Sequence, residues 1–114
     1  MSRPSSEEKL VDDFIRLLEF RQTEPDRFTS LHVHPYTRHL YGGQAVAQAM
    51  RAAEMTTDGR PLHSLHAYFL RGGDGAQPVD YAVTRAFDGR AVCNRQVIAA
   101  QNGEHRLTLS ASFH

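Results

Sequence analysis

Apolar positions recur at helical intervals in the first part of the chain. Over residues 7–21 they follow a 3.6-residue period, with acids early and arginines late, as the helix dipole favours. Ser5 and Glu8 have capping-box spacing, which predicts a helix start. We therefore expect a flexible lead-in over residues 1–6 and an amphipathic outer helix over residues 7–21.

The last part of the chain alternates apolar and polar residues from residue 79 onward, the period of a strand with one buried face. Asp88-Gly89 and Asn102-Gly103 are strong signals for tight hairpin turns. They divide this part into three strands, which predicts an antiparallel meander. Two earlier apolar runs, residues 28–34 and 62–70, are predicted to be strands as well.

A segment rich in alanine lies between those two runs and predicts a second helix over residues 43–55, because alanine has the highest helix propensity. Such a thin, mostly apolar helix is usually buried, since another element can close around it at short range. We expect the sheet to curl around it, which gives an α+β fold. Residues 7–114 are expected to be one domain, with residues 27–114 as its core.

Charge and cysteine content exclude several classes of protein. Lys plus Arg and Asp plus Glu both number 13, so no net charge favours a nucleic acid or an anionic membrane surface. No apolar run is long enough to span a bilayer, so membrane insertion is not expected. Cys93 is the one cysteine, which excludes an internal disulfide and fits a reducing compartment. A cytoplasmic location is the default.

The start of the alanine-rich helix is a candidate ligand site. Gly42 and Gly43 leave backbone N–H groups that a carbonyl oxygen or an anion can reach. Gln44, Gln48 and Arg51 share one stripe of the helix. The two amides cannot act as a base, but they can hold a water molecule. The alternative is that this stripe faces solvent or a partner subunit.

His63 and His66 suggest metal binding or catalysis. Residues three apart on a strand point to opposite faces, so the pair cannot share one ion, and we expect no metal site. His66 as a general base stays open. Its commoner use would be as a hydrogen-bonded histidine inside the sheet. Cys93 has no neighbouring group to activate it and is interpreted as a small buried residue.

Four motifs follow one another along the chain: Leu40-Tyr41-Gly42-Gly43-Gln44, His63 to Arg71, Asp88-Gly89-Arg90 with Arg95 and Val97, and Ala111-Ser112-Phe113. Together they resemble the N-terminal half of the acyl-CoA thioesterase II family, whose members have a double-hotdog fold of two helix-wrapped sheets. The resemblance implies a single hotdog here. Two motifs depart from the family: Arg71-Gly72-Gly73 stands where members commonly have Arg-Pro-Gly, and Ala91-Val92-Cys93 replaces a Ser/Phe/Ser run.

The resemblance implies binding of a fatty-acyl-CoA and its hydrolysis to free acid and coenzyme A, which enters only as part of the substrate, with no other cofactor. The catalytic Asp, Thr and Gln attributed to the family lie in its second half, which this sequence does not contain. Whether the chain is an enzyme by itself therefore stays open, with Gln44, Gln48 and His66 as catalytic candidates. One alternative is a non-catalytic acyl-CoA-binding or structural half. Another is an acyl-thioester hydratase or dehydratase with His66 as base.

Three arginines are the candidates for contacts to the phosphates of coenzyme A, because a guanidinium matches phosphate in charge and geometry. Arg71 ends a predicted strand and Arg90 follows a tight turn, so both lie at a rim. Arg95 lies within a strand, where pairing with an acid is the alternative. Sites in this fold are generally built between two hotdog units, so we expect a homodimer, a higher homo-oligomer or a second hotdog domain. The expected substrate-binding residues are Gly42, Gly43, Gln44, Arg71, Arg90 and Arg95.

Overall fold

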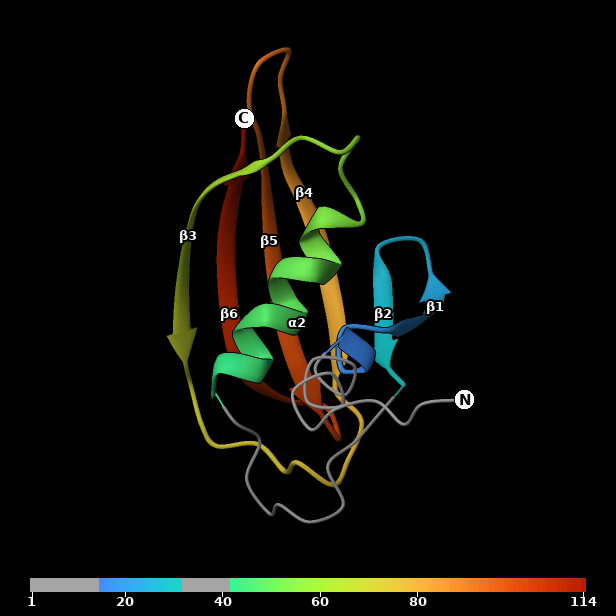
Figure 1. The fold of residues 1–114 in the computed structure, drawn as a ribbon. Coiled ribbons are helices and arrows are strands. Elements are labelled where there is room, and N and C mark those ends of the chain that lie inside the picture. Colours follow the sequence, from blue (N-terminus) through green and yellow to red (C-terminus); the bar gives the residue numbers. More distant parts are fainter. Residues whose placement is uncertain (1–14, 32–41) are drawn as a thin grey trace, which may run out of the picture.

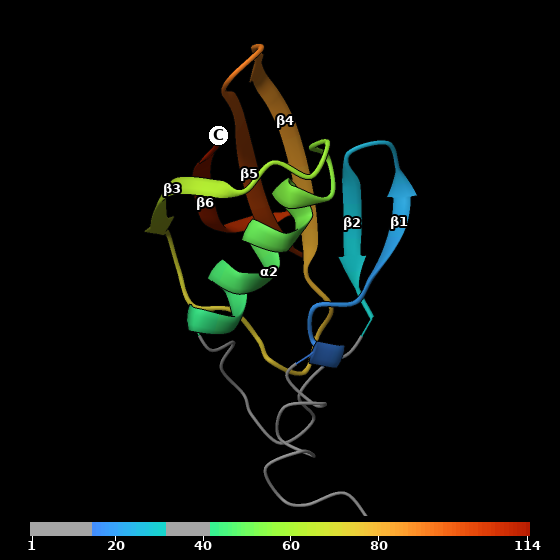
Figure 2. The same cartoon turned by 45° about the horizontal axis from the view of Figure 1, so that its top comes forward.

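A curved antiparallel sheet wraps one face of a single long helix in the computed structural model, which describes residues 15–31 and 42–114 (Figures 1 and 2). The helix is α2 (Gly42–Glu54). The strands are β1 (Phe20–Glu24), β2 (Arg27–Ser30), β3 (Leu62–Phe69), β4 (Asp80–Asp88), β5 (Cys93–Gln101) and β6 (Glu104–Phe113). They lie in the order β1-β2-β4-β5-β6-β3. The α+β fold predicted from the sequence is confirmed.

Helix α2 turns its alanines toward the sheet. Ala49, Ala52 and Ala53 are fully buried and Ala45 nearly so, and the helix packs mainly on β5 and β6. Because a methyl group projects little from the helix axis, the concave sheet can approach α2 closely along this face. The burial predicted for the alanine-rich helix is therefore confirmed for its sheet-facing side, while Arg51 on the other side is exposed.

Strands β4, β5 and β6 form the predicted meander. Leu107, Leu109 and Phe113 on β6 are all at most 1% exposed, and they share the face that α2 covers. Asn102 and Gly103 join β5 to β6 with φ angles of 52° and 78°. Both angles are positive, as a tight hairpin turn requires, and asparagine and glycine adopt them at low cost. Strand β3 then pairs antiparallel with the outer side of β6.

The beginning of the described chain corrects the prediction of an outer helix that reaches residue 21. Strand β1 starts at Phe20 and pairs with β2. The Phe20 ring lies 6.0 Å from the ring of Phe28 and 5.5 Å from that of Tyr81, measured between centroids. Packing of this ring against the core and pairing with β2 override the local helical period. Residues 1–14, and with them most of the predicted helix, lie outside the described residues, as do residues 32–34 of the predicted strand over residues 28–34.

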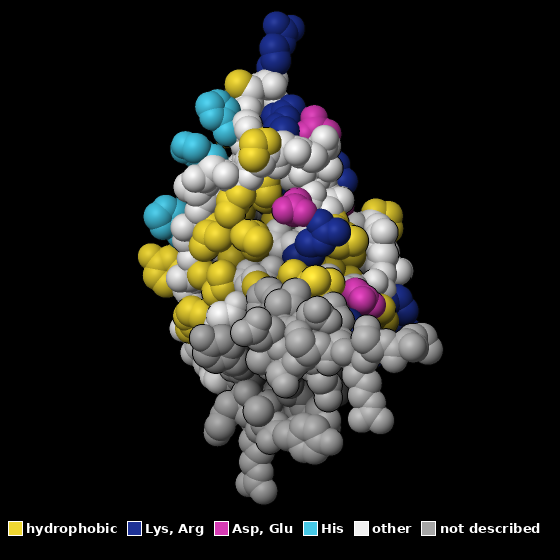
Figure 3. All heavy atoms as spheres, in the orientation of Figure 1, with side chains coloured by type: hydrophobic (Ala, Val, Ile, Leu, Met, Phe, Trp, Pro, Cys, Tyr) yellow, Lys and Arg dark blue, Asp and Glu magenta, His cyan; other side chains and the backbone are white. Residues whose placement is uncertain are grey.

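The two edges of the sheet differ in length and character. β3 is the longer edge strand, and it carries exposed apolar residues: Leu62 at 38%, Tyr68 at 72% and Phe69 at 60% exposure. Hydrophobic side chains and several histidines gather on the side of the molecule where β3 lies (Figure 3). β1 is short, and its register shifts between Gln22 and Glu24. No helix in the described ranges is long and apolar enough to cross a membrane.

Candidate functional site

A small cavity lies where α2 begins, β3 ends and β6 starts. Its volume is about 40 Å³. Apolar side chains form one part of its wall and two arginines another, and the lining residues are Gly42, Ala45, Phe69, Arg71, Gly72, Gly73, Arg106 and Leu107. A cavity of this size holds only a few water molecules. Within the described ranges, it is therefore a partial site that needs further walls to enclose a larger ligand.

Gly42 lets an aromatic ring approach the start of α2. A Cβ at this position would lie 3.2 Å from Cε1 and 3.3 Å from Cζ of Phe69, which is tighter than ordinary contact. The first N–H groups of a helix lack partners within it, and together they carry a partial positive charge. No acidic residue lies in the first turn of α2 to compensate that charge. This helix start can therefore attract a carbonyl oxygen or an anion beside the apolar face of Phe69.

The two glutamines of α2 have different environments. Gln44 is only 7% exposed, and the structure records no hydrogen bond between its amide and the rest of the described chain. Gln48 is fully buried: its Oε1 accepts a hydrogen bond from the Tyr81 hydroxyl at 2.5 Å, and its Nε2 donates to the carbonyl oxygen of Leu17 at 2.6 Å. The prediction that this stripe faces solvent or a partner is wrong for Gln44 and Gln48. It holds only for Arg51, which is exposed and pairs with Glu54.

Burial raises the pKa of Tyr81, because the phenolate form would lose its hydration. The hydroxyl therefore stays protonated and serves as a donor to Gln48. Gln48 therefore has a structural role: its hydrogen bonds link α2 to β4 and to the segment before β1. This arrangement argues against the predicted role of Gln48 in holding a catalytic water.

Arg95 has no free N–H group left to donate to a ligand. Its side chain is 2% exposed, and each of its five N–H groups has an acceptor at 2.7–3.3 Å: Thr56 Oγ1, the carbonyl oxygens of Thr56, Phe87 and Asn94, and Asp88 Oδ1. Arg95 thus fastens the chain after α2 to the β4–β5 hairpin. The alternative of pairing with an acid is realised, and the contact to coenzyme A predicted for Arg95 has no support.

Arg90 lies far from the start of α2. It is exposed in the β4–β5 turn, which is closed by a hydrogen bond from the Gly89 N–H to the carbonyl oxygen of Val92 at 2.8 Å. Arg60, just after α2, donates to the carbonyl oxygen of Gly89 at 2.8 Å. This turn therefore lies near the C-terminal end of α2, and a helix of 13 residues separates its two ends by about 20 Å. Of the three predicted arginines, only Arg71 lines the cavity beside Gly42.

Arg106 is a cavity residue that the sequence analysis missed. Its Nη1 donates to the carbonyl oxygen of Gly72 at 2.9 Å, and its Nη2 lies 3.5 Å from Glu104 Oε2. The same Glu104 oxygen lies 3.1 Å from Nη1 of Arg71. The Nε of Arg106 is buried without an acceptor among the described residues. The sequence does place this basic residue shortly after the Asn102-Gly103 turn. Its position beside Arg71, however, follows only from the pairing of β3 with β6.

His66 is exposed on β3, so the prediction of a histidine inside the sheet is wrong. Leu65 and Ala67, its neighbours on the strand, pack against the core, which leaves His66 on the face away from α2. His63 packs against His114 with their ring centroids 5.5 Å apart. The described ranges contain no group of three His, Cys, Asp or Glu side chains placed to hold a metal ion. Cys93 is buried, in agreement with its interpretation as a small core residue.

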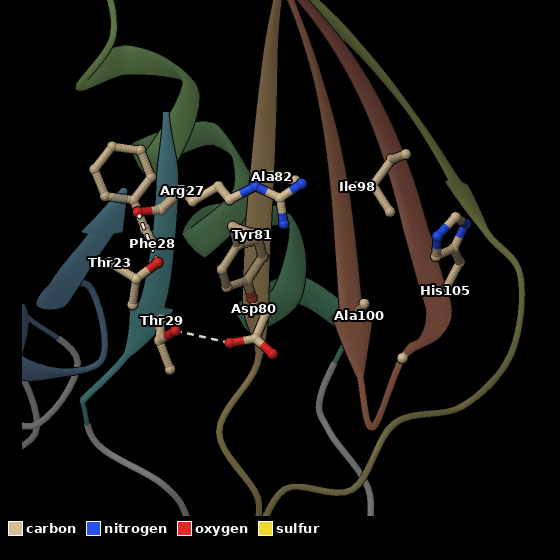
Figure 4. Close-up of a pocket in the computed structure, with 11 residues that line it drawn as sticks. Thr23, Arg27, Phe28, Thr29, Asp80, Tyr81, Ala82, Ile98, Ala100 and His105 are labelled. Carbon is tan, nitrogen blue, oxygen red and sulfur yellow. Dashed lines mark hydrogen bonds between the residues drawn. The ribbon is translucent and has the colours of Figure 1, made fainter. Parts of the chain in front are cut away.

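A larger cavity of about 370 Å³ lies on the face of the sheet away from α2 (Figure 4). The side chains of Ala82, Ile98 and Ala100 lie along it, with Arg27 on one side and His105 on the other. The Thr29 hydroxyl donates to Asp80 at 2.7 Å beside it. None of the residues predicted from the sequence lines this cavity, so it does not coincide with the candidate site at α2.

Comparison with known proteins places the chain among thioesterases. Residues 29–114 match a family model described as the acyl-CoA thioesterase N-terminal domain. The chain is similar to human acyl-coenzyme A thioesterase 8, at 37% identity over 98 residues, and to acyl-CoA thioesterase 2 of Haemophilus influenzae, at 34% over 105 residues. These matches cover 85% and 91% of this chain but only 31% and 37% of the relatives. The chain thus spans about a third of the length of these curated relatives.

Solved structures show the same relationship. The structure of the tesB protein of Mycobacterium avium subspecies paratuberculosis superimposes with a TM-score of 0.85 at 37% identity, covering 90% of this chain and 42% of that one. A TesB2 acyl-CoA thioesterase II from Mycobacterium marinum gives a TM-score of 0.80 at 32% identity. The helix-wrapped sheet is therefore the hotdog fold of these proteins.

Proposed function

This chain belongs to the family of acyl-CoA thioesterase N-terminal domains, and on that basis we propose that it binds a fatty-acyl-CoA thioester at the start of α2. The proposal rests on the cavity in which the N-terminal end of α2 lies beside apolar side chains and Arg71. The thioester carbonyl would approach the N–H groups of Gly42 and Gly43. The acyl chain would extend from the apolar wall beside Phe69 and Leu107, with the buried amide of Gln44 near the reacting group.

Hydrolysis is the expected reaction, and the chain supplies only part of what it requires. A helix N-terminus can stabilise the oxyanion that forms as water attacks a thioester carbonyl. Water attack also needs a general base. The residues found to line the cavity include no carboxylate and no histidine. We therefore propose that this hotdog contributes binding and oxyanion stabilisation, and that a second unit contributes the base.

The second unit would add to the edge of β3. This edge carries exposed apolar side chains, and an unpaired edge strand is a template for another strand. A cavity of about 40 Å³ cannot enclose an acyl chain, so a wall supplied across this edge would complete it. Either a second copy of the chain or another hotdog domain fits this role.

The buried, unpaired Cys93 suits a reducing compartment such as the cytoplasm.

Two assays on the purified chain test the proposal. Calorimetry with medium- and long-chain acyl-CoA should detect binding that Gln44→Ala weakens and that Gln96→Ala, a control on the exposed side of β5, leaves unchanged. Release of thiol from the same substrates measures hydrolysis. Binding without turnover above the blank would favour the non-catalytic half over the enzyme. Absence of binding would contradict the proposed site.

The non-catalytic alternative is favoured by one observation, the lack of a general base among the residues found to line the cavity. The hydratase or dehydratase alternative relied on His66 as base. That residue is exposed on β3 on the face away from α2, so the geometry offers this alternative no support.

A further inference from the structure

Arg71 and Arg106 are held together at the rim of the cavity by the pairing of β3 with β6. The carbonyl oxygen of Arg106 accepts hydrogen bonds from the N–H groups of Leu70 at 2.9 Å and Arg71 at 3.3 Å. The Arg106 side chain also holds the carbonyl oxygen of Gly72. Both guanidinium groups therefore start from fixed backbone positions, which lowers the entropic cost of gathering them around one anion.

The acceptors available to this pair are few. Glu104 Oε2 contacts Nη1 of Arg71 at 3.1 Å and lies 3.5 Å from Nη2 of Arg106, so one carboxylate serves two cations. Arg71 has no other acceptor within the described ranges, and Arg106 has only the Gly72 carbonyl in addition. Most of their ten N–H groups can still donate a hydrogen bond to a ligand oxygen.

Two other arginines, Arg85 and Arg95, are matched to their acceptors. Arg85 makes two hydrogen bonds of 3.0 Å to the two carboxylate oxygens of Asp26, and Arg95 engages all five of its N–H groups. The Arg71–Arg106 pair is instead left with one net positive charge and spare donors beside the candidate site. A phosphate group fits that combination, because it carries up to two charges and several acceptor oxygens.

We propose that Arg71 and Arg106 together bind a phosphate of the coenzyme A moiety and that Glu104 competes with this phosphate for the two guanidinium groups. The inference rests on the proposed function and adds to it a second arginine and a residue that sets affinity. Glu104 is 54% exposed and Arg71 58% exposed, and exposed ion pairs are weak. A ligand phosphate can therefore displace the carboxylate at little cost, and Glu104 disfavours weaker anions.

The test compares Glu104→Gln with Glu24→Gln, which removes another exposed acid, on β1, that pairs with Arg27 instead. Glu104→Gln should tighten binding of coenzyme A by about threefold, the scale of one exposed ion pair, whereas Glu24→Gln should not. Arg106→Lys keeps the charge but loses the paired N–H donors of the guanidinium group. This variant should weaken binding of coenzyme A by a similar factor. Thermal unfolding identifies any variant that has lost its fold.

Ligand fragments separate this inference from the proposed function. An acyl-pantetheine thioester, which lacks phosphates, should bind Glu104→Gln and the unchanged chain equally. Dephospho-coenzyme A and 4′-phosphopantetheine identify which phosphate responds. The inference is overturned if the chain binds the thioesters but Glu104→Gln behaves as Glu24→Gln, or if the variant tightens only free fatty acid. Pyrophosphate binding that responds to Glu104→Gln, in a chain that binds no thioester, would retain the anion site and contradict the proposed function.

Discussion

Tyr81 on β4 donates a hydrogen bond of 2.5 Å to Gln48 on α2, and neither side chain reaches solvent. The contact joins the middle of the sheet to the middle of the helix that it wraps. The same glutamine also holds the carbonyl oxygen of Leu17. One buried polar residue thus fixes the helix against two other parts of the chain, in a core that is otherwise largely apolar.

Tyr81→Phe should destabilise the protein although it removes only one oxygen. The variant leaves Oε1 of Gln48 buried without its donor, which costs about 1–3 kcal/mol in the free energy of unfolding. Urea unfolding followed by circular dichroism measures this cost. Pairing the change with Gln48→Leu should recover part of it, because both polar partners are then removed. An additive double variant would show that the two side chains do not interact.

Stability should fall in alkaline solution through Tyr81. Its pKa is raised by burial above the ordinary value of 10.0. Below that value both the folded and unfolded chains keep the proton. Above it the unfolded chain releases the proton and the folded chain does not, so the free energy of unfolding falls by about 1.4 kcal/mol per pH unit. Urea midpoints measured on either side of pH 10 should show this slope, and Tyr81→Phe should remove it.

Arg95→Ala should be far more destabilising than Arg90→Ala. Removing Arg95 leaves the two buried oxygen atoms of Thr56 without their donor, at a cost of about 3 kcal/mol. Arg90 is exposed in a turn, so its removal should stay within about 0.5 kcal/mol. Chemical unfolding of both variants decides the matter. Equal stabilities would contradict the structural role given to Arg95.

Arg71→Ala should weaken acyl-CoA binding by about fivefold, on the scale of 1 kcal/mol for an exposed charged contact. Arg90→Ala should leave it unchanged, because Arg90 lies near the opposite end of α2. Calorimetric titration of the two variants with one acyl-CoA tests the position of the ligand. A loss of affinity in Arg90→Ala alone would move the nucleotide to the C-terminal end of the helix.

Tyr68→Asp should reduce self-association if a second copy supplies the missing wall. The change places a charge on the exposed β3 edge, where Tyr68 is 72% exposed, and charges on edge strands oppose pairing. Val92→Asp, at the exposed tip of the β4–β5 hairpin, serves as the control. Light scattering gives the mass of each variant. A monomer in the unchanged chain would contradict self-pairing and point to another hotdog domain.

Local patterns predicted the elements that depend on neighbours in sequence. The alternation of Leu107, Leu109, Ala111 and Phe113, together with the Asn102-Gly103 turn, predicted the meander, because strand period and turn geometry are local properties. The alanine content predicted α2 for the same reason. The family followed from four short motifs whose order, rather than any single residue, is specific.

The errors concern contacts between distant segments. The first two residues of β1 were assigned to a helix that ends at residue 21, because Phe20 continues the helical period of the preceding residues. Its packing on Phe28 and Tyr81 and its pairing with β2 place it in a strand instead. Gln48 was expected either to hold a water molecule or to face solvent or a partner, because its actual partner Tyr81 lies 33 residues away in the sequence. Arg106 was missed because its meeting with Arg71 depends on the pairing of β3 with β6.

The inequality of the two sheet edges limits how many copies can join. If two chains pair symmetrically through β3, each end of the merged sheet is a β1 strand of five residues with an irregular register. Such an edge is a poor template for a further strand. Such pairing would then stop at a closed dimer and should not extend into fibres.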